Sequence, residues 1–238
     1  MMKNFSLLIC MFLCALSLFA KSQIAVKHDP DAAEVFLTLE GHWVFHNPKA
    51  RFVVYSLTSV GCPGCLAFVL KGQAMFVKRF GKIASFRDID YFLTKKDLTA
   101  MAMISVLPKK LQDTVRPYML EQQNRWGAEG VSTLEFMTKF LEASGFTLSA
   151  EYYNKIEEAR VSQLQQRQGL DMIYTIQYLP FFLVMDSLTN ELHIVDTLTN
   201  LTSFLEDQLE AQEKLENTRQ KNLNKRRKQK NAKLRCDG

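Results

Sequence analysis

A pair of cysteines two residues apart constrains the fold of this chain more than any other sequence feature. Residues 51–57 are a short, β-branched and aromatic run, which is typical of a strand buried on both faces. This run leads into Cys62-Pro63-Gly64-Cys65, and the apolar residues that follow recur at three- and four-residue intervals, as in a helix packed on a core. The sequence therefore predicts a buried strand, a cysteine motif and a helix in direct succession.

A Cys-x-x-Cys motif at the junction of a strand and a helix supports two kinds of chemistry. Free backbone amides and the helix dipole stabilise a thiolate on the first sulfur, which makes Cys62 the candidate nucleophile and Cys65 the candidate resolving thiol. Pro63 suits the first helical position, because its missing N–H group costs nothing there. The same motif also supplies half of a zinc site.

Redox chemistry is favoured over metal binding because the chain offers few further ligands. No second Cys-x-x-Cys is present, Cys236 lies in a charged C-terminal segment, and the four histidines show no metal-ligand spacing. A structural zinc site needs four ligands. We therefore expect no metal and no cofactor, and Cys62 and Cys65 are the predicted catalytic residues.

Residues 1–22 have the layout of a secretory signal peptide. Lys3 precedes an apolar run over residues 5–19, and the small residue Ala20 follows it. The run is shorter than the roughly 20 residues that span a bilayer, so a cleaved signal is favoured over a retained membrane anchor. Leu18 is larger than cleavage sites prefer, which keeps the anchor open as an alternative. Export to the periplasm would place the close cysteine pair in an oxidising compartment, where it is naturally a disulfide.

The middle of the chain, about residues 97–170, carries helical patterns and few strand signals. Ser132 and Glu135 have the spacing of a capping box, and Gly145 stands where that helix should end. Ser149 can cap the helix that follows. We expect this block to be a helical insertion in an α/β domain.

Two apolar runs after the insertion, residues 181–186 and 192–196, are joined by turn-forming residues and predict an antiparallel hairpin. Pro180 opens the first of them. A trans proline often starts a strand, whereas thioredoxin-like folds hold a cis proline at this position, opposite the active disulfide. Because a Cys-x-x-Cys is already in place, we favour the cis bond.

The order of these elements resembles the DsbA thiol oxidases of the bacterial periplasm, over about residues 34–209. The separation of Cys62 from Pro180 is close to that family's span, and thioredoxin itself has a much shorter one. The resemblance implies a thioredoxin-like mixed sheet with an inserted helical domain. It further implies that Leu179 and Pro180 bind the substrate strand, that the substrates are cysteine-containing exported proteins, and that a membrane protein of the DsbB kind reoxidises the pair.

Three positions depart from the family pattern. Gly64 stands where the typical DsbA has histidine, so a group that stabilises the Cys62 thiolate is missing and we expect a weaker oxidant. Ser56 occupies a position where related proteins often have a buried acid that assists proton transfer, so this assistance is either absent or supplied by another residue. Tyr178 and Leu179 are bulkier than the usual residues before the proline. A disulfide reductase or isomerase, or a non-catalytic metal carrier or assembly partner with the same fold, therefore remains an alternative function.

Residues 213–238 form a tail of different composition from the domain at 23–212. Residues 214–238 contain ten lysines and arginines but only two acidic residues. Apolar residues are sparse in the same segment, which favours an unfolded segment. The first interpretation of this charge is a solvated segment without a function of its own, and the next is attraction to an anionic membrane surface. We expect no nucleic-acid partner for an exported protein.

Overall fold

The computed structural model describes residues 25–27 and 41–236. The predicted signal peptide lies outside the described residues. Within them, no helix combines the length and the apolar character that crossing a membrane requires.

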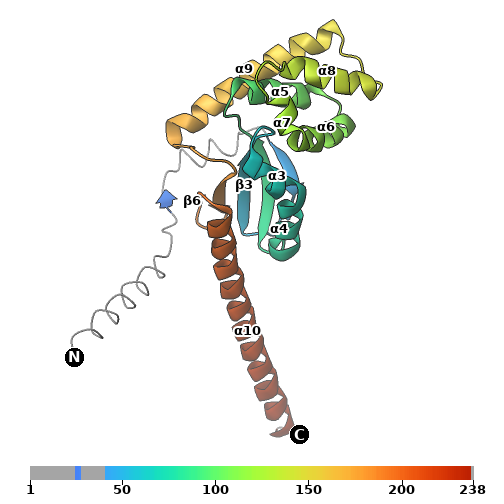
Figure 1. Cartoon of the computed structure of the whole chain (residues 1–238). Helices are drawn as coiled ribbons and strands as arrows, with labels where there is room; N and C mark the ends of the chain where they lie inside the picture. The colour runs from blue at the N-terminus through green and yellow to red at the C-terminus, as the bar shows by residue number, and fades with distance from the viewer. Residues whose placement is uncertain (1–24, 28–40, 237–238) are drawn as a thin grey trace, which may run out of the picture.

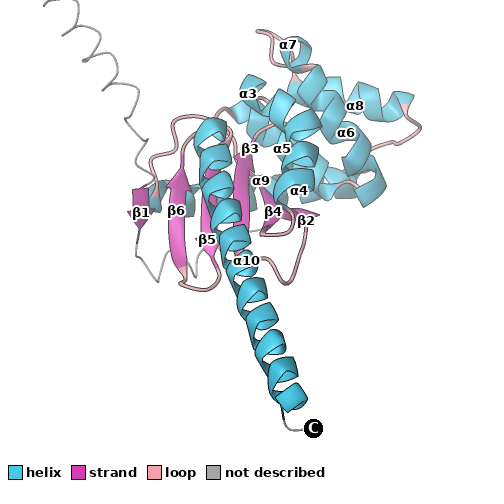
Figure 2. Cartoon of the chain, turned by 90° about the horizontal axis from the view of Figure 1, so that it is seen from below, coloured by secondary structure: helices cyan, strands magenta, loops and turns pink. Residues whose placement is uncertain are grey.

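A mixed β-sheet forms the centre of the described fold (Figure 2). Its strand order is β1-β6-β5-β3-β4-β2, in which β3 and β4 are parallel and all other neighbours are antiparallel. The strands are β1 (Ala25–Lys27), β2 (His42–Phe45), β3 (Phe52–Thr58), β4 (Ala84–Asp90), β5 (Phe181–Asp186) and β6 (Glu191–Val195). The parallel pair and the β5–β6 hairpin confirm the predicted mixed sheet.

Helices cover both faces of this sheet. On one face, Val54 of β3 packs in a cluster with Phe68 and Phe76 of the segment after the cysteines, and with Leu205 of the last helix. On the other face, Leu57 packs near Leu170 at the end of the longest insertion helix. Because β3 is central and covered on both sides, six of its seven residues are buried, as its apolar sequence predicts.

The helix after the cysteine motif is continuous but irregular. It comprises α3 (Pro63–Ala67), the π-helical turn η1 (Phe68–Gly72) and α4 (Gln73–Phe80). Its apolar side chains Phe68, Phe76 and Phe80 face the sheet. π-helical turns inside α-helices often mark functional sites, and this one follows Cys65 by three residues.

A helical insertion separates β4 from β5, which confirms the predicted insertion. Its helices are α5 (Lys95–Val106), α6 (Lys109–Glu121), α7 (Gln123–Trp126), α8 (Thr133–Ala143) and α9 (Ala150–Ile173). Figure 1 shows them gathered beyond the end of the sheet where α3 begins. They enclose a core of their own around the buried Trp126, whose indole N–H donates to the carbonyl oxygen of Met119 at 2.7 Å.

The predicted helix boundaries in the insertion hold at three positions. Ser132 caps α8, and its hydroxyl accepts from the backbone N–H of Glu135 at 3.3 Å. Gly145 follows α8 with φ +79, a backbone conformation that favours glycine. Ser149 precedes α9 as predicted, although its side chain makes no capping hydrogen bond.

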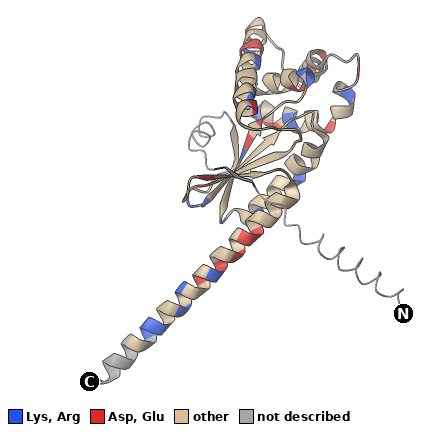
Figure 3. Cartoon of the chain, turned by 90° about the vertical axis from the view of Figure 1, so that its left-hand side faces the viewer, with Lys and Arg blue, Asp and Glu red and all other residues tan. Residues whose placement is uncertain are grey.

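The C-terminal segment differs from the unfolded tail that its composition predicts. Helix α10 (Leu198–Cys236) begins on the sheet and continues past Gln212 as a projecting helix (Figures 1 and 3). Residues 198–236 contain neither glycine nor proline, and Lys, Arg, Glu, Gln and Leu favour helix. Pairs four residues apart, such as Glu210 with Lys214 at 3.3 Å, add local support.

Candidate active site

The cysteine motif lies at the junction of β3 with the helical layer, as predicted. Cys62 is the N-cap residue of α3, and its Sγ is bonded to Sγ of Cys65, with the Cα atoms 5.2 Å apart. The backbone N–H of Cys65 points at Sγ of Cys62 at 3.0 Å. A reduced Cys62 would therefore form a thiolate at a helix N-terminus with an amide donor aimed at it, which lowers the pKa of a thiol.

The two sulfurs differ in their access to solvent. Cys62 is 4% exposed and Cys65 is completely buried. Above them, Pro63 and Gly64 are exposed. An incoming thiolate can therefore reach Cys62 first, after a small displacement of its surroundings, whereas Cys65 is confined to reacting inside the protein.

The peptide bond between Leu179 and Pro180 is cis, which confirms the favoured interpretation of this proline. The carbonyl oxygen of Leu179 lies 3.3 Å from Sγ of Cys62, so the chain before β5 covers the first sulfur. Tyr178, the next residue back, is 75% exposed. The structure thus brings together Cys62, Cys65, Leu179 and Pro180, although they come from segments more than a hundred residues apart.

Gly64 is placed where the cis-proline segment comes closest to the cysteine motif. A Cβ atom at position 64 would lie 3.0 Å from the carbonyl oxygen of Leu179 and 3.5 Å from Cδ of Pro180. The first distance is tighter than ordinary van der Waals contact, so a side chain here requires Leu179 to move. A histidine at this position would therefore require the cis-proline segment to move by a few tenths of an ångström.

The helical insertion holds the loop that carries Cys62. The side-chain amide of Gln123, the first residue of α7, donates to the carbonyl oxygens of Val60 at 2.9 Å and Cys62 at 3.0 Å. A Cβ atom on Gly61 would lie 1.9 Å from the carboxylate of Asp97 in α5. Sequence reasoning did not identify Gln123 or Gly61 as site residues, because both depend on how the insertion folds back on the motif.

Asp88 supplies a buried acid beside Ser56. These residues are direct cross-strand partners on β4 and β3. The Asp88 carboxylate, 1% exposed, accepts hydrogen bonds from the Ser56 hydroxyl and from the side-chain amide of Gln73, the latter at 2.5 Å. Burial raises the pKa of Asp88, against the opposing effects of nearby His42 and these hydrogen bonds. Reading Ser56 alone missed this acid, since the strand register was needed to find it.

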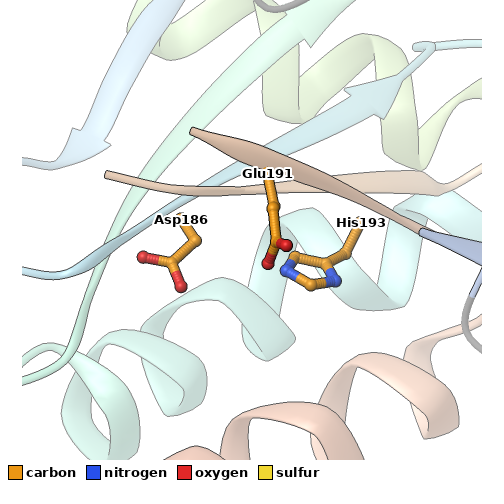
Figure 4. Close-up of side chains that lie close together, drawn as sticks. All are labelled: Asp186, Glu191 and His193. Carbon is orange, nitrogen blue, oxygen red and sulfur yellow. The ribbon is translucent and has the colours of Figure 1, made fainter. Parts of the chain in front are cut away.

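A separate cluster on β5 and β6 brings together Asp186, Glu191 and His193, whose ligand atoms lie within 4.8 Å of one another (Figure 4). The spacing of the histidines gave no sign of this grouping. The Asp186 carboxylate already accepts hydrogen bonds from Arg51, the shortest at 2.6 Å, and from the backbone N–H of Leu188 at 2.9 Å. Its oxygens are therefore engaged by the protein itself, and the cluster is better described as part of an ion-pair network.

Comparison with solved structures finds similar folds with low sequence identity. Wolbachia pipientis alpha-DsbA1 is 14% identical, with a TM-score of 0.55 over 73% of this chain and 94% of that chain. Oxidised BdbD from Bacillus subtilis is 18% identical, with a TM-score of 0.51 over 70% and 91%. A thioredoxin-like oxidoreductase from Silicibacter pomeroyi is 12% identical, with a TM-score of 0.51 over 78% and 98%.

This chain has a DsbA-like thioredoxin fold. That fold confirms the predicted class, a thioredoxin-like mixed sheet with an inserted helical region. No protein-family model matches the sequence, and the search of curated proteins found no match. The similarity therefore concerns the fold, and the function of the cysteine site has to be argued from its own residues.

Proposed function

We propose that this protein is a thiol-disulfide oxidoreductase that exchanges disulfides with cysteines of exported proteins, acting as an oxidase. The observation that carries the proposal is the arrangement at Cys62. Its sulfur is bonded to Cys65, receives the backbone N–H of Cys65 at 3.0 Å, and lies beside the segment that contains the cis proline. The DsbA-like fold supports the same conclusion, and the N-terminal apolar run supports action in the periplasm.

The proposed reaction is a pair of thiolate displacements. A substrate thiolate attacks Sγ of Cys62, so a substrate–Cys62 disulfide forms, the Cys62–Cys65 bond breaks, and Cys65 leaves as a thiolate that takes up a proton. A second substrate thiolate attacks the substrate sulfur of this mixed disulfide, which closes the substrate disulfide and releases Cys62 as a thiolate. Two electrons pass from the substrate to the cysteine pair.

The substrate strand is proposed to bind at Leu179 and Pro180. The Leu179 carbonyl is 3.3 Å from the reacting sulfur, so a peptide bound to this segment would present its thiol close to Cys62. Tyr178 offers an exposed aromatic surface at the same place. Because a peptide backbone carries its own donors and acceptors, pairing of this kind tolerates many sequences.

The oxidase direction requires a partner that removes two electrons from the reduced pair, and we propose a membrane protein of the DsbB kind. Gly64 is the argument for the opposite direction of electron flow. Without a histidine cation at this position the reduced Cys62 thiolate is less stabilised, so the cysteine pair is a weaker oxidant. The competing function is a disulfide reductase or isomerase that uses the same two cysteines.

For the projecting half of α10 we propose contact with an anionic membrane surface. Side chains from residue 213 to residue 227 are exposed, and the helix carries mostly acidic residues near the sheet and basic residues beyond Arg219 (Figure 3). A basic segment gains about 1 kcal/mol per lysine or arginine near anionic lipid. Such contact would place the domain near a membrane partner.

Refolding of a reduced protein that needs its disulfides for activity tests the proposed function. The oxidised chain should restore that activity, and Cys62→Ser should abolish the effect. Cys65→Ser should accumulate mixed disulfides between Cys62 and the substrate, which are visible on non-reducing electrophoresis. Cys236→Ser is the matched control and should leave the rate unchanged.

Two outcomes would change the proposal. Acceleration of a scrambled substrate, without net transfer of disulfides to a reduced one, would assign the isomerase function. Failure of the oxidised chain to react with either substrate would reject thiol-disulfide exchange altogether.

A further inference from the structure

A hollow of about 340 Å³ lies where α10 leaves the sheet (Figure 1). It is enclosed by the loop that leads into β3, by Lys82 before β4, by Leu188 in the β5–β6 turn, and by α10 from Gln208 to Arg219. Ligand sites in proteins commonly have volumes of about 300–1,000 Å³. The hollow is therefore large enough to hold a small molecule or one end of a larger one.

The hollow lies at the end of the sheet opposite the cysteine pair. Phe52, the first residue of β3, pairs with Ala84 at the start of β4 and with Asp186 at the end of β5. These residues mark the end of the sheet beside the hollow, whereas Cys62 follows the other end of β3. The seven residues of β3 span about 20 Å. A ligand in the hollow therefore leaves the cysteine pair uncovered.

Three cationic side chains from different segments line the hollow: Lys49, Lys82 and Arg219. Among the described residues, no ion pair and no hydrogen bond engages the charged groups of these three side chains. Arg51, by contrast, is bound to the carboxylate of Asp186 at 2.6 Å. Because like charges repel, bringing three cations to one place without partners favours the binding of an anion between them.

Two acidic residues of the adjoining part of α10 have partners of their own. Glu206 is paired with Arg79 at 2.5 Å, and Glu210 is paired with Lys214 at 3.3 Å. Glu216 is the acidic residue that lines the hollow. One carboxylate against three cations without partners leaves the lining with a net positive charge.

Two exposed leucines stand beside these cations. Leu188 is 76% exposed and Leu215 is 52% exposed, and both line the hollow. Cations next to exposed apolar side chains suit a ligand that has an anionic group and an apolar part. Lysine and arginine are common partners of phosphate groups, and apolar side chains enter a membrane at the boundary between headgroups and acyl chains. A phospholipid has both features in one molecule.

We propose that the hollow binds the phosphate group of an anionic phospholipid. Lys49, Lys82 and Arg219 hold the phosphate, while Leu188 and Leu215 enter the lipid layer beside it. This inference rests on the membrane contact proposed for α10 and makes that contact specific. The basic helix beyond Arg219 attracts the protein to an anionic surface, and the hollow then binds one lipid of that surface.

A short-chain lipid that stays monomeric in water measures the site without a membrane. In calorimetric titration of the full chain, dihexanoyl phosphatidic acid should bind at least about tenfold more tightly than inorganic phosphate, which has no apolar part to bury. It should also bind more tightly than dihexanoyl phosphatidylcholine, whose headgroup carries a cation. Lys49→Gln and Lys82→Gln should each weaken its binding severalfold, and Glu216→Gln should strengthen it. Unchanged binding in both lysine variants would overturn the inference.

Lys110→Gln is the matched control. Lys110 is an exposed lysine of α6 and does not line the hollow, so the same change of charge should leave lipid binding unchanged. Lys49 and Lys82 are also exposed, and all three variants should unfold at the wild-type temperature. Equal weakening in Lys110→Gln would show that net charge alone attracts the lipid, which also overturns the inference.

Co-sedimentation with vesicles that contain phosphatidylglycerol separates the hollow from the projecting helix. Arg226→Gln/Arg227→Gln removes charge from the helix only, so it should weaken vesicle binding and leave the titration with soluble lipid unchanged. Lys49→Gln/Lys82→Gln should weaken both. If the wild-type chain does not bind these vesicles, the proposed membrane contact fails and the lipid assignment fails with it. If the wild type binds them and the double lysine variant binds equally well, only the role of the hollow fails.

Discussion

Two buried carboxylates on strands next to β3 have pKa values displaced in opposite directions. For Asp186, burial raises the pKa, but hydrogen bonds from Arg51 and from the Leu188 backbone outweigh that effect and hold the pKa below its usual range. For Asp88, whose hydrogen-bond donors are neutral, burial prevails and raises the pKa. The chemistry of each group therefore follows from its partners: Asp186 is a fixed anion, and Asp88 can change protonation.

At the residue scale, Arg51→Ala should destabilise the fold by about 1–2 kcal/mol near neutral pH, because it leaves the buried Asp186 carboxylate short of donors. Arg51 is partly exposed, so solvent screening limits the loss. The depressed pKa of Asp186 contributes stability above about pH 4, its unfolded pKa, and this contribution is lost as the pH falls through the lower folded value.

Urea unfolding at several pH values checks this prediction. The difference between Arg51→Ala and the wild type should shrink in acid, where Asp186 becomes protonated. Arg79→Ala removes a more exposed ion pair with Glu206 and is the matched control, with an expected change below about 1 kcal/mol. Equal losses in both variants at every pH would contradict the account of Asp186.

A second prediction at the residue scale concerns the close approach at Gly64. Gly64→Ala places a Cβ atom 3.0 Å from the Leu179 carbonyl oxygen, so the cis-proline segment must shift by a few tenths of an ångström. We expect peptide exchange to slow severalfold in stopped-flow assays with little change in stability. Gly169→Ala in α9, where a Cβ meets nothing within 4 Å, should instead stabilise the helix by up to about 1 kcal/mol.

At the scale of elements, the insertion acts as a support for the active-site loop. Gln123 of α7 donates two hydrogen bonds to this loop. Gln123→Ala should cost about 1–2 kcal/mol of stability, because two carbonyl groups lose their donor. It should also speed alkylation of Cys62 in the reduced protein, since the loop is held less firmly.

Gln122→Ala is the neighbouring control, because within the described part of the chain the Gln122 side chain accepts only from Arg125, on the exposed surface at 3.1 Å. Thermal unfolding and alkylation rates should be close to the wild-type values in this variant. If the two variants behave alike, the insertion does not stabilise the loop through Gln123.

The parts of the fold that were predictable from sequence are those with local patterns. The apolar run of β3, the Cys-x-x-Cys at a helix start and the capping serine of α8 each act within a few residues. The position of Asp88 beside Ser56 depends on the register of two strands, and the contact of Gln123 with the cysteine loop depends on how the helices pack. Neither could be predicted from short sequence patterns. The projecting half of α10 was predicted to be unfolded because it is highly charged and poor in apolar residues. The prediction did not take into account that the same charged residues have a high helix propensity.

At the scale of the whole molecule, the domain and the projecting half of α10 are separable. Residues 213–227 are exposed, and none of them belongs to the buried core. A chain ending at Gln212 should therefore keep its unfolding temperature and its disulfide exchange. It should lose co-sedimentation with vesicles that contain anionic lipid, at low salt, while neither form binds neutral vesicles. Equal vesicle binding by both forms would contradict the membrane role of α10.

The central claim is that Cys62 and Cys65 form a reversible redox couple. The most direct measurement is their equilibrium with glutathione, in which alkylation and mass analysis report the state of each cysteine. The account predicts one two-electron transition shared by Cys62 and Cys65, with a potential less oxidising than the roughly −120 mV of DsbA. Cys62 should be alkylated first in the reduced form. A pair that stays oxidised at every glutathione ratio, or reduced at every one, would contradict it.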